Sequence, residues 1–179
     1  MLLQYELTVD DLVAFNRYHC AQSPSVRRTK YAAMFVVAMM LIAASYLIPA
    51  TADVSRGVIF ALAIGFAGLF AVIFNVTYPA SMDRAIRRMC REGANKGLVG
   101  RHELEIDAEG LIERTEFNET RQSWRGVERI GETDDYAFIY ISAIMAHVIP
   151  RQTVISGDPD AFIARAKQLW QAQVSGPPE

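Results

Sequence analysis

The sequence is poor in the residues that build disulfide frameworks, metal sites and active sites. Its two cysteines, Cys20 and Cys90, are too few for a disulfide scaffold and show no metal-ligand spacing. There is no glycine-rich phosphate loop and no HExxH motif, and the three histidines, His19, His102 and His147, stand in separate segments. We therefore expect no cofactor, no metal, no catalytic residue and no enzyme, and we interpret each histidine as a surface or packing residue.

An excess of charge of one sign is also absent. The formal net charge of −2 at pH 7 gives no reason to expect a nucleic acid partner. Glu103 and Glu105 share one face of a predicted strand, and the alternation of a half-solvated strand accounts for both. Trp124 and Trp170 are predicted to be core residues and not platforms for a ligand.

Apolar residues, by contrast, are concentrated in two long uncharged runs, 31–52 and 57–82. About 20 helical residues cross a hydrocarbon core about 30 Å thick, so each run is long enough. The short linker from Pro49 to Arg56 makes the two helices antiparallel neighbours. The sequence thus predicts a membrane hairpin at 31–82, with spans at 31–52 and 57–79, and the lipid bilayer as a partner.

Two other interpretations of the runs fit the sequence less well. A buried core helix of a soluble protein nearly always carries a polar face, whereas only Ser45, Asn75 and Thr77 interrupt these runs. Ala50-Thr51-Ala52 resembles a signal-peptide cleavage site, but about 30 residues precede the first run and they do not form a short basic region. The hairpin is the preferred interpretation.

Basic residues flank the runs on one side only. Four stand before the first run and six follow the second, while the linker holds only Arg56. The positive-inside rule then places both termini of a multi-pass membrane protein in the cytoplasm. The residues expected to meet anionic lipid at the membrane surface are Arg27, Arg28, Lys30, Arg84, Arg87, Arg88 and Arg91.

Small residues recur on one face of the second run. Ala63, Ala67 and Ala71 follow each other at four-residue spacing, which allows a neighbouring helix to approach closely. Packing within the hairpin is favoured over a dimerisation face, although a homo-oligomer stays possible. Asn75 is interpreted as a helix-pairing hydrogen-bond group or an interfacial residue.

The remaining segments are polar and foldable. Residues 1–30 read as a strand, LLQYELT, and an amphipathic helix capped by Thr8, and residues 83–99 as a basic stalk and connector. Residues 100–174 form a mainly-β domain closed by a helix that starts at Asp158-Pro159, and 175–179 form a tail. The predicted strands are His102–Asp107, Leu111–Glu116, Arg121–Trp124, Val127–Glu132, Tyr136–Ser142 and Ala146–Val154.

The order of these elements resembles the YcxB-like family of bacterial membrane proteins. The resemblance rests on TVDDLVAFNRYH and SPSVRR before the spans, then on GRHELEIDAEGLIE, QSWRGVERIGETDDYAFIYIS and HVIPRQTV after them. It implies a two-span anchor and a domain similar to bacterial pleckstrin-homology-like folds, with a bent antiparallel sheet capped by a C-terminal helix. Such a sheet has seven strands, and LLQYELT is the candidate for the missing edge strand. The family supplies no activity that could be carried over.

Three functions from different classes follow from these features. The preferred one is a membrane-anchored interaction module that binds a protein, a peptide or an inner-leaflet lipid. The second is a structural or regulatory subunit of a larger inner-membrane complex, with the alanine face as its contact. The third is a small oligomeric transporter or channel, which two nearly featureless spans make the weakest of the three.

Overall fold

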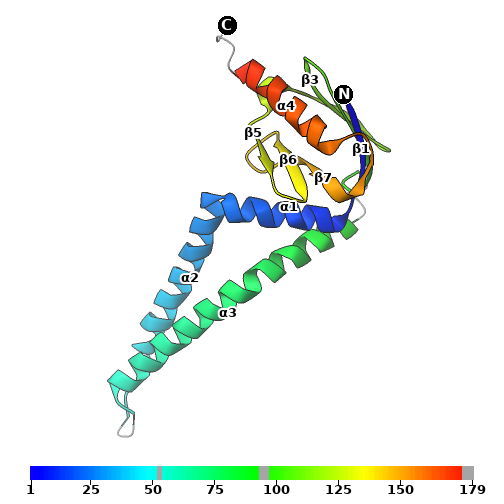
Figure 1. Ribbon diagram of the computed structural model, residues 1–179. Helices are drawn as coiled ribbons and strands as arrows, with labels where there is room; N and C mark the ends of the chain where they lie inside the picture. The colour runs from blue at the N-terminus through cyan, green and yellow to red at the C-terminus, as the bar shows by residue number, and fades with distance from the viewer. Residues whose placement is uncertain (52–53, 93–96, 175–179) are drawn as a thin grey trace. The chain divides into compact units, whose positions relative to one another are not determined.

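The computed structural model describes residues 1–51, 54–92 and 97–174. The chain divides into two units, which we call the sheet domain (Met1–Asn16 with Ile86–Glu179) and the helical hairpin (Arg17–Ala85) (Figure 1). Parts of three predicted segments lie outside the described residues: 52–53 of the span end and linker, 93–96 of the connector, and the tail 175–179.

Three helices contribute to the first half of the chain: α1 (Val9–Gln22), α2 (Pro24–Ser45) and α3 (Arg56–Arg91). Ser23 caps α2, because its side chain accepts a hydrogen bond from the backbone N–H of Val26, and Pro24 occupies the first helical turn. Both long helices have the composition and length to cross a membrane.

The first helix of the hairpin ends before the uncharged run does. Pro49 has no N–H to donate to the Ser45 carbonyl four residues earlier, and its ring disfavours helix at that point. The Arg56 guanidinium takes over as donor, with Nη1 at 3.5 Å from the carbonyl oxygen of Ser45, 3.1 Å from that of Tyr46 and 2.9 Å from that of Ile48. The only basic residue of the linker therefore stabilises the end of α2.

The second helix is longer than the run that predicts it. α3 continues for 36 residues through Pro79 to Arg91, so the second span and the basic stalk are one helix. The apolar run and the basic residues that follow it therefore lie on one continuous helix, which rises about 1.5 Å per residue.

The sheet domain contains two antiparallel sheets and the C-terminal helix α4 (Pro159–Val174). The strand order is β4-β3-β2-β1-β8 in the larger sheet and β5-β6-β7 in the smaller one. The strands are β1 (Leu2–Leu7), β2 (Gly100–Ile106), β3 (Gly110–Thr115), β4 (Glu119–Ser123), β5 (Arg129–Glu132), β6 (Tyr136–Tyr140), β7 (Ala146–Pro150) and β8 (Val154–Ser156). The predicted combination of two apolar helices, a strand-rich region and a capping helix is confirmed.

The N-terminal strand joins this domain, but not at an edge. β1 pairs with β2 from Leu2↔Glu105 to Leu7↔Gly100, and on its other side it pairs with β8. The expectation that LLQYELT forms an edge strand is therefore wrong. The edge is taken by β8, the short strand that precedes α4.

The predicted strand Ala146–Val154 is also wrong, because it is two strands that belong to different sheets. The 3₁₀ turn η3 (Arg151–Thr153) separates β7 from β8. Pro150 ends β7, and the Thr153 hydroxyl donates to the Glu6 carbonyl oxygen at 2.6 Å, which directs the chain to β1. Beyond β8, Gly157 has φ of +97°, a conformation that favours glycine.

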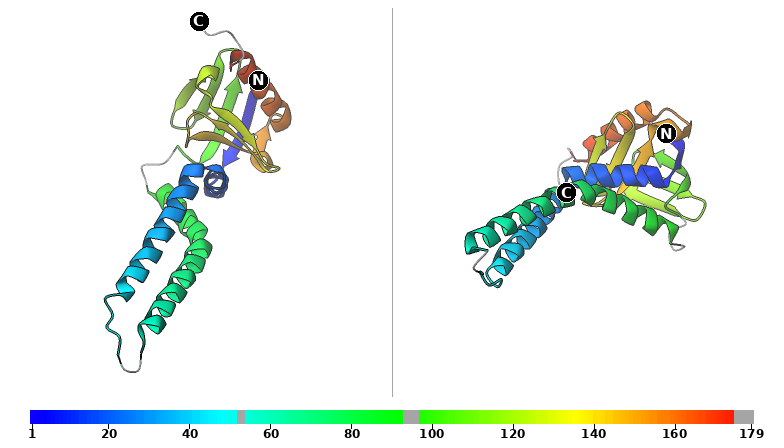
Figure 2. Two further views of the ribbon diagram at one scale, coloured as in Figure 1. Left: turned by 90° about the vertical axis from the view of Figure 1, so that its left-hand side faces the viewer. Right: turned by 90° about the horizontal axis from the view of Figure 1, so that it is seen from below.

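The core of the domain lies between the sheets. Alternation buries Leu104 and Ile106 of β2, while Glu103 and Glu105 face outward. α4 contributes buried side chains, among them Phe162. Figure 2 shows α4 and the first half of α1 on different sides of the strands.

Trp124, in the 3₁₀ turn η2 (Trp124–Gly126) between β4 and β5, is fully buried, as predicted. Its ring N–H donates to the Asp107 carbonyl oxygen at 2.9 Å. Trp170 of α4 is half-buried and donates to the Val127 carbonyl oxygen at 2.9 Å. Both indoles thus serve the packing of the sheet domain.

Candidate functional site

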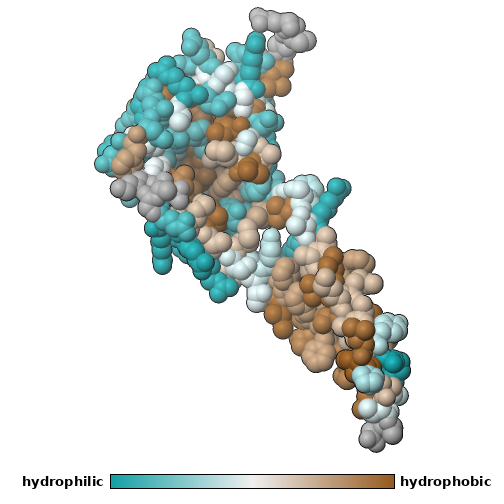
Figure 3. Space-filling model, turned by 180° about the vertical axis from the view of Figure 1, so that it is seen from behind, coloured by the Kyte–Doolittle hydropathy of each residue, from teal (hydrophilic) through white to brown (hydrophobic). Residues whose placement is uncertain are grey.

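The helical hairpin exposes large apolar side chains along most of its length. Only 6% of the most apolar stretch of α2 and 11% of that of α3 is buried. Figure 3 shows the resulting apolar surface over the two long helices, to which exposed side chains such as Phe35, Phe66 and Val76 contribute. A core helix of a soluble protein would be mostly buried, so this surface supports the membrane interpretation of the hairpin.

The predicted packing residues lie on the less exposed face of α3. Ala67 is buried, Ala63 and Ala71 are half-buried, and Ile59 one turn earlier is also buried. Asn75 is exposed, and its side-chain oxygen accepts a hydrogen bond from Lys30 Nζ at 2.5 Å. Lys30 also lies 5.4 Å from the centre of the Tyr78 ring, so one lysine of α2 makes two polar contacts with α3.

A carboxylate lies among the basic residues of α3. Asp83 is buried and forms an ion pair and hydrogen bonds with Arg17 of α1. This pairing raises the pKa of the Arg17 guanidinium through its hydrogen bond to Asp83. The sequence offered no signal for the pair, because the two residues are far apart along the chain.

The predicted lipid-contact residues differ in their surroundings. Arg87 forms an ion pair with Asp10 at 2.6 Å, and the Arg84 Nε donates to the Ala80 carbonyl oxygen at 3.2 Å. Four of the seven predicted lipid-contact residues are exposed and form no ion pair or side-chain hydrogen bond within the described part of the chain: Arg27, Arg28, Arg88 and Arg91.

Distance along α3 also separates these residues. At about 1.5 Å per residue, Arg84 lies about 9 Å beyond Tyr78 along the helix axis, whereas Arg91 lies about 20 Å beyond it. The headgroup layer is only about 5–8 Å thick on each side of the hydrocarbon, and salt screens charges beyond about 8 Å. Arg84 is therefore better suited than Arg91 to meet lipid phosphates.

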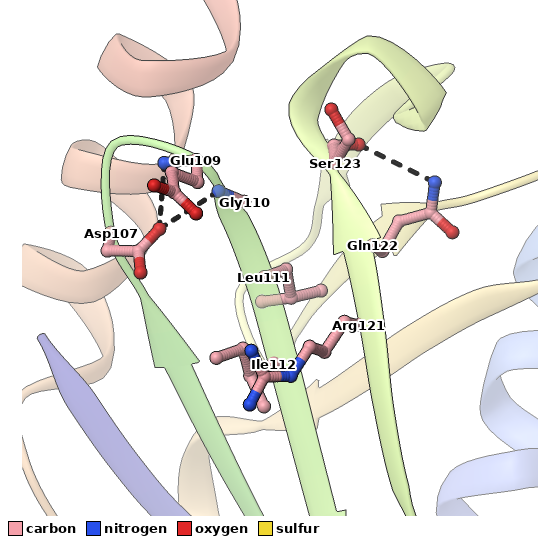
Figure 4. Close-up of a pocket in the computed structure, with 8 residues that line it drawn as sticks. All are labelled: Asp107, Glu109, Gly110, Leu111, Ile112, Arg121, Gln122 and Ser123. Atoms are coloured by element: carbon pink, nitrogen blue, oxygen red, sulfur yellow. Dashed lines mark hydrogen bonds between the residues drawn. The ribbon is translucent and has the colours of Figure 1, made fainter.

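A shallow cavity of about 180 Å³ lies at one end of the larger sheet, beside its edge strand β4. Figure 4 shows the turn from Asp107 to Gly110 on one side of it and Arg121, Gln122 and Ser123 of β4 on the other. The Asp107 carboxylate accepts hydrogen bonds from the backbone N–H groups of Glu109 (2.8 Å) and Gly110 (3.0 Å). These bonds lower the pKa of Asp107.

Gly110 is required where this turn approaches β4. A Cβ atom at this position would lie 2.2 Å from the Gln122 carbonyl oxygen, which is far closer than any side chain tolerates. The backbones of β3 and β4 therefore fix the cavity wall.

Two histidines that stand far apart in the sequence, His102 and His147, meet inside the sheet domain. His102 Nδ1 lies 3.0 Å from Glu113 Oε1, and His147 Nδ1 lies 3.2 Å from the same oxygen. Both imidazoles are buried, and the ring of Tyr5 stacks on His102 with 5.6 Å between ring centres. We call His102, Glu113 and His147 the His-Glu-His cluster.

The cluster joins the two sheets, since His102 and Glu113 belong to β2 and β3 and His147 belongs to β7. Burial raises the pKa of Glu113, but the hydrogen bonds from the two imidazoles outweigh it and lower the pKa to about 2. Tyr5 has its pKa raised by burial and by the charge of Glu113. No group of His, Cys, Asp or Glu side chains suited to a metal ion occurs within 1–51, 54–92 and 97–174.

Only a weak sequence signal pointed to this cluster. His102 falls in the buried phase of the alternation that includes Leu104 and Ile106, so a buried histidine could have been anticipated. Its meeting with His147 depends on how the two sheets face each other, which local patterns do not encode.

Comparison with known proteins supports the resemblance noted from the sequence. Residues 106–164 match the family described as YcxB-like protein, over a range that runs from the end of β2 into α4. Neither a curated protein nor a solved structure matches the chain. The sheet domain of this chain therefore carries a YcxB-like domain at residues 106–164.

Proposed function

We propose that this chain is a membrane-anchored interaction module: the hairpin holds the sheet domain at the cytoplasmic face of a bacterial inner membrane, and the domain acts by binding and not by catalysis. The observation that carries the proposal is the contrast between an apolar helical surface and a domain with its own buried core. The excess of basic residues on one side of the spans supports the cytoplasmic location. Two sheets and a C-terminal helix are also what a pleckstrin-homology-like fold would have.

The edge strand β4 is the surface that we assign to the partner. Within the described residues it pairs with β3 on one side only, and its residues from Glu119 to Ser123 are mostly exposed. A free strand edge can add an extended segment of another chain through backbone hydrogen bonds. The cavity beside β4 has room for about one side chain of such a segment. A protein or peptide partner is therefore preferred over a lipid for this surface.

Topology is the first test. Both native cysteines, Cys20 and Cys90, are replaced by serine, and single cysteines are introduced as Ser55→Cys in the linker and Ser123→Cys in the sheet domain. An impermeant maleimide applied to intact cells is expected to label the first variant and not the second. Labelling at position 123 would place the domain outside and overturn the cytoplasmic assignment.

Partner binding is tested by photo-crosslinking in cells. A photoreactive phenylalanine replaces Thr120 in β4 or, as the matched control, exposed Ala164 in α4. We expect a discrete adduct from position 120 only. Arg121→Glu in β4 should reduce this adduct, whereas Arg125→Glu in the neighbouring turn η2 should leave it intact. Equal adducts from both positions, or none from position 120, would count against β4 as the binding edge.

A further inference from the structure

The hydrogen-bond pattern of the β3–β4 hairpin determines which backbone groups of β4 face away from the sheet. At the turn, the Thr115 N–H donates to the Asn118 carbonyl oxygen at 2.9 Å, so these two residues form a hydrogen-bonded pair. In an antiparallel ladder, such pairs alternate with pairs whose N–H and C=O groups point away from the partner strand. The register therefore turns the backbone groups of Glu119, Arg121 and Ser123 away from β3.

This open edge carries one charge of each sign, two residues apart. Glu119 and Arg121 lie on the same outer face of the sheet as Glu103, because side chains alternate along each strand and the register aligns them. The Glu119 carboxylate accepts a hydrogen bond from Arg121 Nε at 3.1 Å and another from Arg114 Nε at 2.9 Å. Among the described strands, β4 has β3 as its only neighbour, so the other side of these residues is open.

The edge could pair with the same edge of a second copy in only a few registers. Outward residues must lie opposite outward residues, and two identical antiparallel strands are related by a two-fold axis. An axis at Glu119 or at Arg121 would set two like charges directly opposite each other, which is destabilising. An axis at Gln122 or Ser123 would pair no opposite charges within the two strands. An axis at Thr120, in contrast, sets Glu119 of each copy opposite Arg121 of the other.

We propose that β4 pairs with β4 of a second copy of this chain across a two-fold axis at Thr120, which joins the two larger sheets into one. This inference rests on the proposed function, because it names the partner of the edge that is assigned to binding there. In the pair, each Glu119 lies between its own Arg121 and the Arg121 of the other copy. The two Thr120 side chains form a cross-strand pair of a favourable kind.

The same register provides a place for an exposed aromatic ring. Phe117, in the turn between β3 and β4, is 58% exposed. Pairing about Thr120 sets Phe117 of one copy opposite Ser123 of the other, and Ser123 lines the cavity of about 180 Å³ beside β4 (Figure 4). Leu111 and Ile112 also line this cavity, and a cavity of about 150 Å³ is large enough for a benzene ring. The turn and the cavity lie at opposite ends of β4, so an antiparallel second copy brings them together.

The pairing is short, since β4 has five residues. Two strands of this length are only marginally stable as a pair in water. Two chains that are anchored in the same bilayer have a higher effective concentration for each other, which favours the pair. The test is therefore made with the full chain in the membranes of the cells that express it.

Disulfide cross-linking tests the register. In a chain with Cys20→Ser and Cys90→Ser, a single cysteine replaces Thr120 at the axis or Gln122 on the same face of β4. The two copies of position 120 would have Cα atoms about 4.5 Å apart, which a disulfide can bridge, whereas the two copies of position 122 would lie about 13 Å apart along the strands. Oxidation should therefore give about tenfold more dimer from Thr120→Cys than from Gln122→Cys or from Ala164→Cys on exposed α4.

Charge reversal tests the contact between the copies. In the Thr120→Cys chain, Arg121→Glu or Glu119→Arg would set like charges opposite each other at two places, so each should reduce the dimer about tenfold. When the two reversed chains are co-expressed with different tags, a mixed pair has opposite charges at both places. The mixed dimer should return to the level of the parent, which would also show that both variants fold. Arg125→Glu, in the turn η2 beyond the strand, is the matched control and should leave the dimer unchanged.

Equal dimer yields from positions 120, 122 and 164 would overturn the proposal, as would reversed chains that dimerise like the parent. The photo-crosslink at position 120 separates this result from the proposed function. An adduct with twice the mass of the chain supports the second copy as the partner. An adduct with a different protein alone would overturn the pairing of two copies and leave the interaction module in place, whereas no adduct would overturn both.

Discussion

The helical hairpin and the sheet domain handle large apolar side chains in opposite ways. In the domain, side chains such as Phe138 and Phe162 are almost fully buried. In the hairpin, Phe66 is 62% exposed and Val76 is 70% exposed. Water does not favour both arrangements, since removing apolar surface from water stabilises a fold by about 25 cal/mol per Å². The difference supports the proposal that one unit lies in water and the other in lipid.

Polar side chains follow the same division. The hairpin places its polar contacts near the ends of the apolar stretch, where Arg56 caps α2 and Lys30 bonds to Asn75. The sheet domain instead brings a charged cluster into its interior. Water at the surface of the domain hydrates outward polar side chains such as Glu103 and Glu105, whereas the middle of a span offers polar groups no such partner.

The largest expected effect comes from removing a buried ring. Phe162→Ala should lower the free energy of unfolding of the sheet domain by about 3–5 kcal/mol, because it leaves a cavity at a fully buried position. Phe66→Ala in α3 should leave the same quantity unchanged. Urea unfolding with tryptophan fluorescence measures both, and a comparable loss in the two variants would show that α3 is part of the folded core.

The next effect tests whether α3 meets lipid. Leu69 is exposed near the middle of the apolar stretch, and Leu69→Asp should disfavour insertion by about 3 kcal/mol, or roughly a hundredfold in the insertion equilibrium. In a water-exposed helix the same change would be nearly neutral. Maleimide labelling of Ser55→Cys reads out insertion. Leu98→Asp, at an exposed position outside the helices, is the control, and unchanged labelling in Leu69→Asp would argue against a span.

The sequence was most informative where the physical rule is local. Uncharged length predicted the two apolar helices, and alternation predicted strands close to β2 and β3. The stop of α2 was hidden by the apolar Tyr46, Leu47 and Ile48, although Pro49 supplied its cause. The residues of a helix or a hairpin are neighbours along the chain, so short patterns suffice for these elements.

Long-range pairing explains what was missed. The place of β1 between β2 and β8 depends on strands that follow it by about 100 and 150 residues. The division of Ala146–Val154 into two strands depends on β1 as well, because β8 exists by pairing with it. The meeting of His102 and His147 on Glu113 needs both sheets in place. Contacts of this kind are set by topology and not by periodicity.

A third prediction compares the carboxylates that the two units enclose. Asp83 of the hairpin pairs with Arg17, which does not titrate in proteins, whereas Glu113 of the domain pairs with two histidines. The pKa of Glu113 is lowered to about 2 from an ordinary value of about 4.5. Its contribution is therefore complete above about pH 4.5 and is lost as the pH falls toward 2, in total about 3 kcal/mol. Between about pH 4.5 and 2, the free energy of unfolding of Glu113→Gln, measured by urea unfolding, should therefore fall by about 3 kcal/mol less than that of the parent. Equal losses would mean that Glu113 is not held as a carboxylate by its two partners.

The smallest expected effect concerns a charge pair that both water and salt can reach. Arg87 and Asp10 lie 2.6 Å apart, yet their side chains are 45% and 74% exposed. Such a pair contributes about 0.2–1 kcal/mol, because solvent screens it and two long side chains lose freedom in forming it. Asp10→Asn should thus change the unfolding free energy of the sheet domain by less than about 1 kcal/mol, and the difference should shrink further in 1 M salt. A loss of several kcal/mol that salt does not reduce would mean that lipid or protein shields the pair, and Arg87 would then belong with the buried ion pairs and not with the solvated charges that flank the spans.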